Sequence, residues 1–227
     1  MDKTNIKVKD EEVKKEAKNL FLIIAGIVII FVVFILLTRT PSFSKEEAMT
    51  LDQLHRQNYI NSPNNETMYM YNDHSIIYYN SVWNTQLRGG ETLYDVTFNH
   101  GPKDVEDIEI IGELSEEFIK TDQFYITFDP EGKDLKHIAV ANYGLSSGLA
   151  IAFRLPLKAG CTKNTAGCEN QLLITCDDKN KSIFFFKEDN ETKIIYDDNC
   201  VIIQGSANEI IRAKDKLLYT WYGIIRN

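Results

Sequence analysis

The chain has 227 residues, of which 44% are hydrophobic and 26% charged, and its 25 basic against 33 acidic residues give a net charge of −8. This composition excludes collagen, an intrinsically disordered chain and a multi-span transporter. The acidic balance, with no basic stretch interleaved with aromatic residues, also excludes a nucleic-acid partner. The polar character is uneven, because one segment near the N-terminus contains no polar side chain.

That apolar segment covers residues 20–37 and reads LFLIIAGIVIIFVVFILL. Eighteen helical residues measure about 27 Å, close to the bilayer's hydrocarbon thickness of about 30 Å. A core helix rarely lacks polar residues over this length, and a signal peptide has a shorter apolar stretch followed by a small-x-small cleavage site. Thr38-Arg-Thr-Pro41 follows here instead. We therefore predict an uncleaved transmembrane helix over residues 19–38, with residues 20–37 in contact with the lipid bilayer.

The flanks of this segment predict its orientation. Six lysines precede it within residues 1–18, whereas Arg39 is the one basic residue between the segment and Pro41. Positive charge is retained on the cytoplasmic side of single spans. We expect residues 1–18 to form a cytoplasmic tail and the C-terminal part to lie outside, as in a single-pass protein of the cell membrane.

Residues 39–62 are predicted to form a membrane-proximal helix and linker. Ser44 and Glu47 have the spacing of a capping box, so the helix should run from about residue 45 to residue 60. A turn-rich stretch then leads into an outer domain over residues 63–227.

The first half of the outer domain alternates short β-rich runs with turns, including two hairpins. A helix begins after the last of these runs with Asp134 as its N-cap, and Gly144 or Gly148 should end or bend it. Strand, turn and helix make half of a βαβ crossover, which indicates an α/β portion. Predicted strands cover residues 67–71, 75–79, 82–87, 92–98, 105–111 and 124–128, and a short helix covers residues 115–120.

The C-terminal third predicts an antiparallel meander of three or four strands over residues 171–204, followed by a helix over about 207–225. Ser206 and Glu209 have capping-box spacing. The helix has an apolar stripe that we expect to pack on the sheet, and its polar face, which includes Asp215 and Lys216, mixes both signs of charge. The fold class is therefore α+β: a mixed or antiparallel sheet closed by a C-terminal amphipathic helix.

The four cysteines, Cys161, Cys168, Cys176 and Cys200, all lie on the predicted outer side. Export favours two disulfides, for which three pairings are possible. The loop chemistry between the first two favours Cys161–Cys168, which leaves Cys176–Cys200. A zinc site or a redox pair is the alternative, but both usually need a CxxC spacing that the chain lacks.

Modification and catalytic candidates are few. Asn65 and Asn190 begin Asn-x-Thr glycosylation sequons. The four histidines lack metal-ligand spacing, so no metal or cofactor is predicted. Asp129, Asp134 and His137 follow a predicted strand closely in the sequence and are the pocket candidates that we retain.

A group of segments in the C-terminal half also carries a resemblance. It comprises residues 124–130 (FYITFDP), 132–139 (GKDLKHIA), the cysteine loop 161–176 and residues 199–225, from NCVIIQG to WYGII. Over roughly residues 120–227 the chain resembles uncharacterised single-pass membrane proteins of small-genome archaea. The resemblance implies a membrane anchor with an outward domain, and it implies no activity.

Two functions remain as hypotheses. The first, which we favour, is a membrane-anchored extracytoplasmic binding or assembly domain that is not an enzyme and has a protein partner in the membrane or envelope. The alternative is a tethered hydrolase-like enzyme that uses the carboxylates and His137. A concave polar cluster at Asp129, Asp134 and His137 would favour the enzyme, and an exposed apolar patch would favour the binding domain.

Overall fold

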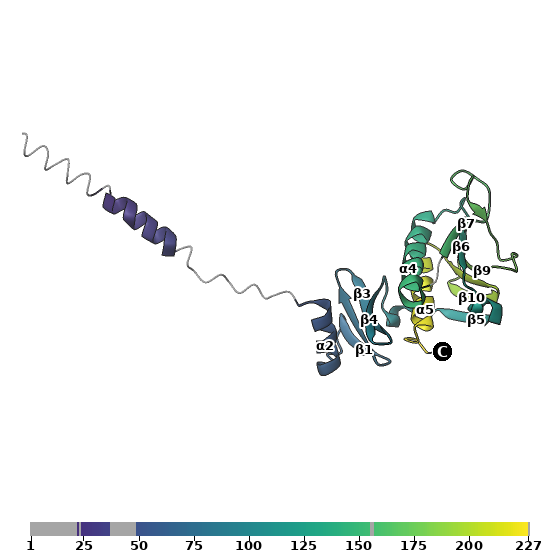
Figure 1. The fold of residues 1–227 in the computed structure, drawn as a ribbon, viewed down its shortest axis with the longest axis horizontal. Coiled ribbons are helices and arrows are strands. Elements are labelled where there is room, and N and C mark those ends of the chain that lie inside the picture. Colours follow the sequence, from purple (N-terminus) through teal and green to yellow (C-terminus); the bar gives the residue numbers. More distant parts are fainter. Residues whose placement is uncertain (1–21, 23, 37–48, 155–156, 227) are drawn as a thin grey trace, which may run out of the picture. The chain divides into compact units, whose positions relative to one another are not determined.

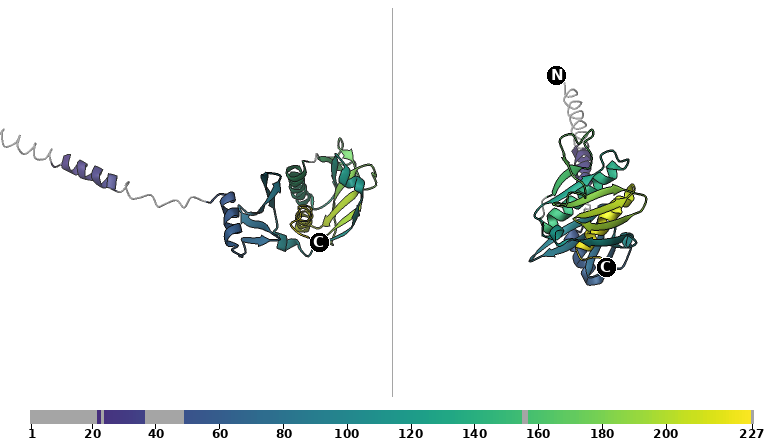
Figure 2. Two further views of the ribbon diagram at one scale, coloured as in Figure 1. Left: turned by 60° about the horizontal axis from the view of Figure 1, so that its bottom comes forward. Right: turned by 90° about the vertical axis from the view of Figure 1, so that its right-hand side faces the viewer.

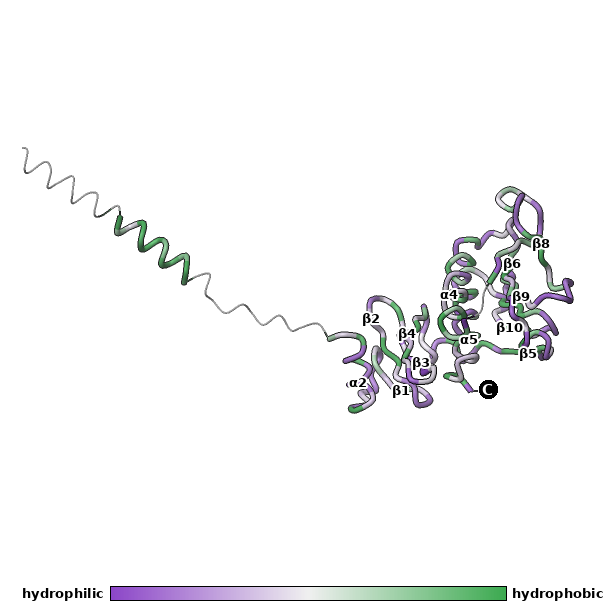
Figure 3. Tube along the Cα trace, viewed as in Figure 1, coloured by the Kyte–Doolittle hydropathy of each residue, from purple (hydrophilic) through white to green (hydrophobic). Residues whose placement is uncertain are grey.

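The computed structural model describes residue 22 and residues 24–36, 49–154 and 157–226, and the chain divides into two compact units, Met1–Met49 and Thr50–Asn227. In the first unit, residues 24–36 form an apolar helix (Figures 1 and 3). Within the described ranges, no helix is long and apolar enough to cross a membrane. The predicted tail 1–18, both ends of the predicted span 19–38 and the predicted capping box at Ser44 and Glu47 lie outside the described residues.

The second unit begins with helix α2 (Leu51–Asn61), which is capped by Thr50 rather than by a residue further upstream. Thr50 Oγ1 accepts from Gln53 N, and Gln53 Oε1 accepts from Thr50 N, so this pair forms the capping box. Two buried side chains hold α2 on the sheet below it. His55 Nδ1 lies 2.7 Å from Ser75 Oγ, and Asn58 Nδ2 donates to the same oxygen at 2.8 Å.

The first sheet is antiparallel and confirms both predicted hairpins. Its four strands follow chain order. Asn72 and Asp73, in the first hairpin turn, have positive φ values of 45° and 69°. Two-residue hairpin turns need positive φ because their backbone then matches the twist of the flanking strands. The strands are β1 (Met68–Tyr71), β2 (His74–Tyr79), β3 (Val82–Gly89) and β4 (Thr92–Phe98).

The second sheet has the order β5-β10-β11-β9-β6-β7-β8, so the chain has the predicted α+β class with one antiparallel and one mixed sheet. The strand predicted over 105–111 is partly wrong. A 3-10 turn, η1 (Pro102–Val105), precedes a strand that begins at Glu109. The other elements of this sheet region are β5 (Glu109–Leu114), α3 (Glu116–Lys120), β6 (Phe124–Phe128), β7 (Leu157–Cys161), β8 (Leu172–Leu173), β9 (Ser182–Glu188), β10 (Lys193–Asp198) and β11 (Cys200–Gly205).

The predicted antiparallel meander is wrong in its strand order. β11 lies between β9 and β10, pairing parallel with β9 and antiparallel with β10. The short β9–β10 link therefore passes the end of β11, where Asp189 N donates to Gly205 O at 3.1 Å. The local sequence predicts that each strand exists. Which strands become neighbours in the sheet depends on the burial of the whole sheet face, to which strands distant in the sequence contribute.

The predicted βαβ crossover is confirmed. Helix α4 (Leu135–Phe153) connects β6 to β7, which pair in parallel. The sequence predicts that Gly144 or Gly148 ends or bends this helix. Neither of them ends it, because α4 continues to Phe153. A Cβ at Gly144 would lie 2.8 Å from Lys214 Nζ, and one at Gly148 would lie 2.6 Å from Tyr222 Oη. The two glycines therefore allow the C-terminal helix to approach α4 closely, as small residues do at tight helix contacts.

That C-terminal helix, α5 (Asn208–Trp221), lies beside α4 in a layer between the two sheets (Figures 1 and 2). It contacts β11 and β10 of the second sheet, and also η1 beyond β4. The prediction that it packs on a sheet is confirmed, but its polar face is buried too. Its buried residues are Ile210, Ile211, Ala213, Lys214, Asp215, Lys216, Leu217, Leu218 and Tyr219.

The capping box predicted at Ser206 and Glu209 is wrong. Ala207 occupies the N-cap position of α5 with φ 47°, and its side chain makes no capping bond. Glu209 Oε2 instead accepts from Arg212 Nη1 at 2.6 Å, because the guanidinium lies one turn further along α5. The helix start is fixed by a carboxylate from α4, described below.

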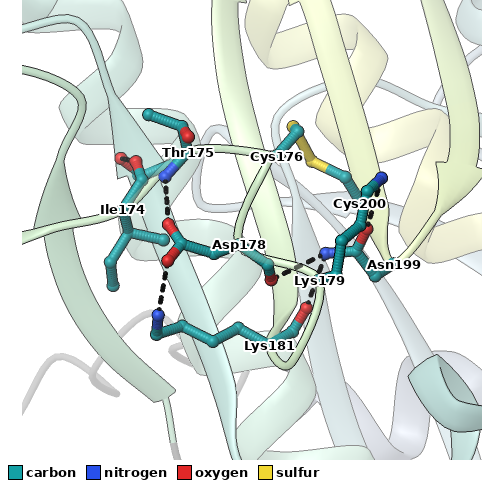
Figure 4. Close-up of a disulfide and its surroundings, with 9 residues drawn as sticks. Ile174, Thr175, Cys176, Asp178, Lys179, Lys181, Asn199 and Cys200 are labelled. Carbon is teal, nitrogen blue, oxygen red and sulfur yellow. Dashed lines mark hydrogen bonds and ion pairs between the residues drawn. A yellow bond between two sulfur atoms is a disulfide. The ribbon is translucent and has the colours of Figure 1, made fainter.

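Both predicted disulfides, Cys161–Cys168 and Cys176–Cys200, are formed, and no cysteine is free. Figure 4 shows the second beside a turn organised by Asp178, whose carboxylate accepts from Thr175 N at 3.0 Å and from Lys181 Nζ at 2.7 Å. The hydrogen bond from Lys181 lowers the pKa of Asp178. The disulfide thus fixes an ordered turn to the start of β11.

Candidate functional site

The three predicted pocket residues lie after β6, but their contacts do not unite them. Asp129 Oδ2 accepts from Lys163 Nζ at 2.8 Å, which lowers the pKa of Asp129. Asp134 Oδ2 accepts from Ala207 N at 2.8 Å. His137 Nδ1 lies 3.6 Å from Asp134 Oδ1, too far for a hydrogen bond. A catalytic role for these residues stays a prediction, while each carboxylate has a structural partner.

Asp134 occupies the N-cap position of α4 as predicted, but its side chain does not cap that helix. Its backbone has φ −102° and ψ 24°, outside the extended conformation that directs a capping side chain toward its own helix. The carboxylate binds the backbone N–H just ahead of α5 instead. Glu188 Oε1 in turn accepts from Asp134 N at 2.7 Å, so this corner joins β9, α4 and α5.

Both sequon asparagines are exposed. Asn65 precedes β1, and its Oδ1 accepts from Thr67 N at 3.0 Å and from Thr67 Oγ1 at 3.2 Å. Asn190 lies in the turn between β9 and β10. Glycosylation at either residue stays a prediction.

The most apolar pocket opens where α4 and α5 both end, at the start of β6. It has a volume of about 330 Å³, and each of its described lining residues is hydrophobic. Aromatic rings pack around it edge to face: Phe118 on Phe124 at 5.2 Å and Phe153 on Trp221 at 6.2 Å between centroids. Its lining residues are Leu114, Phe118, Ile119, Phe124, Phe153 and Trp221.

A second pocket of about 350 Å³ adjoins the first, because Phe153 and Trp221 line both. This second pocket has polar side chains from the first sheet and from the residue directly after α5, namely His74, Arg88, Tyr94 and Tyr222. Tyr222 Oη is buried and has no hydrogen-bond partner among the described residues. Burial raises the pKa of Tyr222 and lowers the pKa of His74, so both side chains are uncharged near neutral pH. We call the two adjoining pockets the aromatic cleft.

The walls of the cleft are held in place by contacts away from it. Trp221 Nε1 donates to Tyr196 Oη at 2.9 Å, which fixes the indole ring against β10. Phe118 and Phe124 are 1% and 3% exposed, whereas Ile119 at the margin is 71% exposed. A rigid aromatic floor with an exposed apolar margin is the usual form of a site that takes up an apolar group.

Sequence reasoning missed a second group, the charged residues buried between α5 and the end of β4. Lys214 and Asp215 are 1% and 0% exposed and form an ion pair with each other. Asp215 Oδ2 also accepts from His100 N at 2.9 Å and lies 3.0 Å from His100 Nδ1. The sequence predicts Lys214 within the apolar stripe of this helix and Asp215 on its polar face, and it indicates no buried ion pair. Only the position of α5 between two sheets makes them internal.

The cleft was also missed, because its described walls come from eight separate elements. The one local signal was the aromatic residue of the α5 stripe, Trp221. Comparison with protein-family models, with curated proteins and with solved structures found no match for this chain. The site is therefore interpreted from its geometry.

Proposed function

We propose that this chain is a single-pass membrane protein whose extracytoplasmic α+β domain is a binding module, with the aromatic cleft as its ligand site. The observation that carries the proposal is the cleft itself: an apolar hollow of about 330 Å³ beside a second one that also has polar groups, at the ends of two packed helices. Volumes above about 300 Å³ with mainly apolar walls and a few polar groups are typical of ligand sites.

The membrane anchor is part of the same proposal. In the described part of the apolar segment, the large side chains are between 45% and 69% exposed, from Ile35 to Ile30. A helix that is apolar on all sides is stable when its surroundings are apolar, as in a bilayer. The two disulfides support an oxidising compartment for the domain. The N-terminus is then cytoplasmic, and a protein partner would lie in the membrane or envelope.

The cleft can be tested with a neutral fluorescent probe such as N-phenyl-1-naphthylamine. The chain has two tryptophans, so Trp83→Phe leaves Trp221 as the one indole that can transfer energy to a bound probe. We expect saturable binding with energy transfer from Trp221 in the full chain. Ile119→Asp should weaken binding at least tenfold, because it places a charge at the apolar margin.

Ile60→Asp is the matched control, since Ile60 is 81% exposed on α2 and Ile119 is 71% exposed at the cleft. The control should bind the probe like the parent, and both variants should unfold at the parent's urea concentration. Probe binding that Ile119→Asp leaves unchanged would show that the cleft is not the site.

The topology is tested separately, by labelling intact cells with a membrane-impermeant lysine reagent. We expect label on the lysines of the second unit and none on the six lysines of residues 1–18. Labelling of the tail without the domain would reverse the orientation. Release of the chain by alkaline carbonate would refute the anchor.

A further inference from the structure

The two halves of the aromatic cleft differ in chemistry, and the difference defines a ligand class. The first pocket is lined by hydrophobic residues and the second by His74, Tyr94 and Tyr222 beside the shared Phe153. A ligand that fills both halves must therefore have an apolar part and a polar part. The polar groups decide which polar part fits.

Hydrogen-bond donors gather at the polar half. Arg154 follows α4 directly and donates from Nη2 to Tyr94 Oη at 3.4 Å. Arg154 is exposed, and no carboxylate of the described residues pairs with it. Tyr222 Oη has no partner in the described ranges either, but it is closed off against α4, where a Cβ at Gly148 would lie 2.6 Å from it. A guanidinium, a phenol and the neutral His74 ring can all donate to a carboxylate.

Arg88 also borders this pocket, but its side chain belongs to the other face of the first sheet. Side chains alternate along a strand, and Gln86, two residues before Arg88, donates to Asp52 of α2 at 2.8 Å. Arg154 is thus the cation whose side chain bonds to a polar group of the cleft, the hydroxyl of Tyr94.

The cleft contains no acidic residue among its described lining residues, although the chain has 33 acidic and 25 basic residues. Three other surface pockets each contain one or two carboxylates: Glu66 and Asp104, Glu117, or Asp52 and Asp95. Those pockets also contain lysine or arginine side chains, three of them in the pocket with Glu117, so the cleft differs in presenting no carboxylate to a negatively charged ligand.

The free carbonyls of a helix C-terminus would repel an anion, but several of those at the ends of α4 and α5 are already bonded. Tyr222 N donates to Leu218 O at 2.9 Å, and Arg154 N donates to Ala150 O at 3.2 Å. Ile224 N donates in the same way to Tyr219 O at 2.9 Å. In the last turn of α5 the carbonyls of Leu218, Tyr219 and Thr220 are therefore bonded, and in α4 that of Ala150 is.

The apolar half has room for one hydrocarbon chain. Its volume of about 330 Å³ corresponds to about eleven water molecules at about 30 Å³ each. A methylene group occupies nearly the same space as a water molecule, so a chain of about ten carbons fits. Two such chains, as in a membrane phospholipid, do not.

We propose that the aromatic cleft binds a single-chain anionic amphiphile, a fatty carboxylate of about ten carbons, with its chain in the apolar half and its carboxylate at Arg154 and Tyr94. This inference rests on the proposed binding function and names the ligand class of the same cleft. It assigns Arg154 as the residue that distinguishes a carboxylate from a neutral head group.

The test is displacement of N-phenyl-1-naphthylamine from the full-length Trp83→Phe chain. We expect decanoate to displace the probe at a concentration at least tenfold lower than decanol or decyltrimethylammonium. Arg154→Gln should remove this preference by weakening decanoate and leaving decanol unchanged. Lys133→Gln, an exposed site in the turn after β6, is the charge-matched control and should keep the preference. Phosphatidic acid with two ten-carbon chains should compete at least tenfold less well than decanoate.

Decanol that competes as well as decanoate, or an Arg154→Gln variant that weakens both equally, would overturn the carboxylate assignment. Equal competition by the two-chain lipid would overturn the single-chain assignment. In each case saturable, Ile119-dependent probe binding would leave the proposed function standing. Absence of probe binding in the parent would refute both.

Discussion

Replacing Asp215 by asparagine should destabilise the domain far more than any exposed carboxylate substitution. Asp215 is fully buried, is paired with Lys214 and accepts from the backbone N–H groups of Asn99 and His100 at 3.2 and 2.9 Å. Asparagine has nearly the same shape, but it removes the charge that balances Lys214. Its amide also brings N–H donors to a site already filled with donors.

The magnitude follows from burial. Removing one partner of a buried ion pair typically costs about 3–5 kcal/mol, because the remaining charge is left without water or a counter-charge. Lys214 is only 1% exposed and lies over Gly144, so it has no open route to solvent. The comparison is Asp107→Asn, whose carboxylate is 67% exposed beside Arg212 and should cost about 0.2–1 kcal/mol.

Urea unfolding of the full chain measures both free energies, provided that the slopes with denaturant agree. A Lys214→Met substitution in the Asp215→Asn background should recover about 1–2 kcal/mol, because it removes the uncompensated charge. A loss below about 1 kcal/mol for Asp215→Asn, or a double variant no more stable than the single one, would refute this reasoning.

Three further outcomes are expected. Replacing both cysteines of the Cys200 disulfide by alanine should lower the free energy of unfolding in urea by about 3.4 kcal/mol, against about 2.4 kcal/mol for the Cys168 disulfide. The reason is the longer loop, because the two sequence separations are 24 and 7. Equal losses would contradict the loop-length argument. Gly148→Ala should lower the melting temperature, since the clash with α5 costs about 1–3 kcal/mol against a gain in helix propensity of about 1 kcal/mol; a stabilised variant would show that α5 can move aside. Burial lowers the pKa of His55 in the folded protein below the unfolded value of about 6.5. The contribution of the neutral His55 side chain to stability is therefore full above about pH 6.5. It is lost as the pH falls toward the lower folded pKa, by up to about 1.4 kcal/mol per pH unit. His55→Gln should therefore flatten the decline in stability between about pH 7 and pH 5, and an unchanged decline would assign it to other groups.

The features predicted from the sequence are those that a few neighbouring residues determine. Asn72 and Asp73 accept positive φ, so the first hairpin can be predicted from its turn alone. The strand over residues 124–128 and the Cys161–Cys168 loop are similarly local. In each case the chemistry that forms the element is complete within about ten residues.

The features that failed depend on partners far along the chain. β10 pairs with β5, whose residues precede it by more than eighty positions, and no local pattern specifies that pairing. Asp134 was predicted to cap its own helix, but it binds Ala207 near α5. The same distance hid the cleft, because Phe124, Phe153 and Trp221 lie far apart in the sequence and meet only in the folded domain.

The central position of α5 has a consequence for the order in which the chain folds. The helix comes after every strand that the structure describes, yet Tyr219 Oη donates to His100 O across 119 positions of sequence. Before α5 emerges during synthesis, the strands that it contacts, β10 and β11, lack this part of the helical layer. Such non-local contacts form slowly and leave apolar strands open to aggregation. Chains that stop short of Asn208 should therefore depend on chaperones and be cleared by proteases rather than accumulate as a folded fragment.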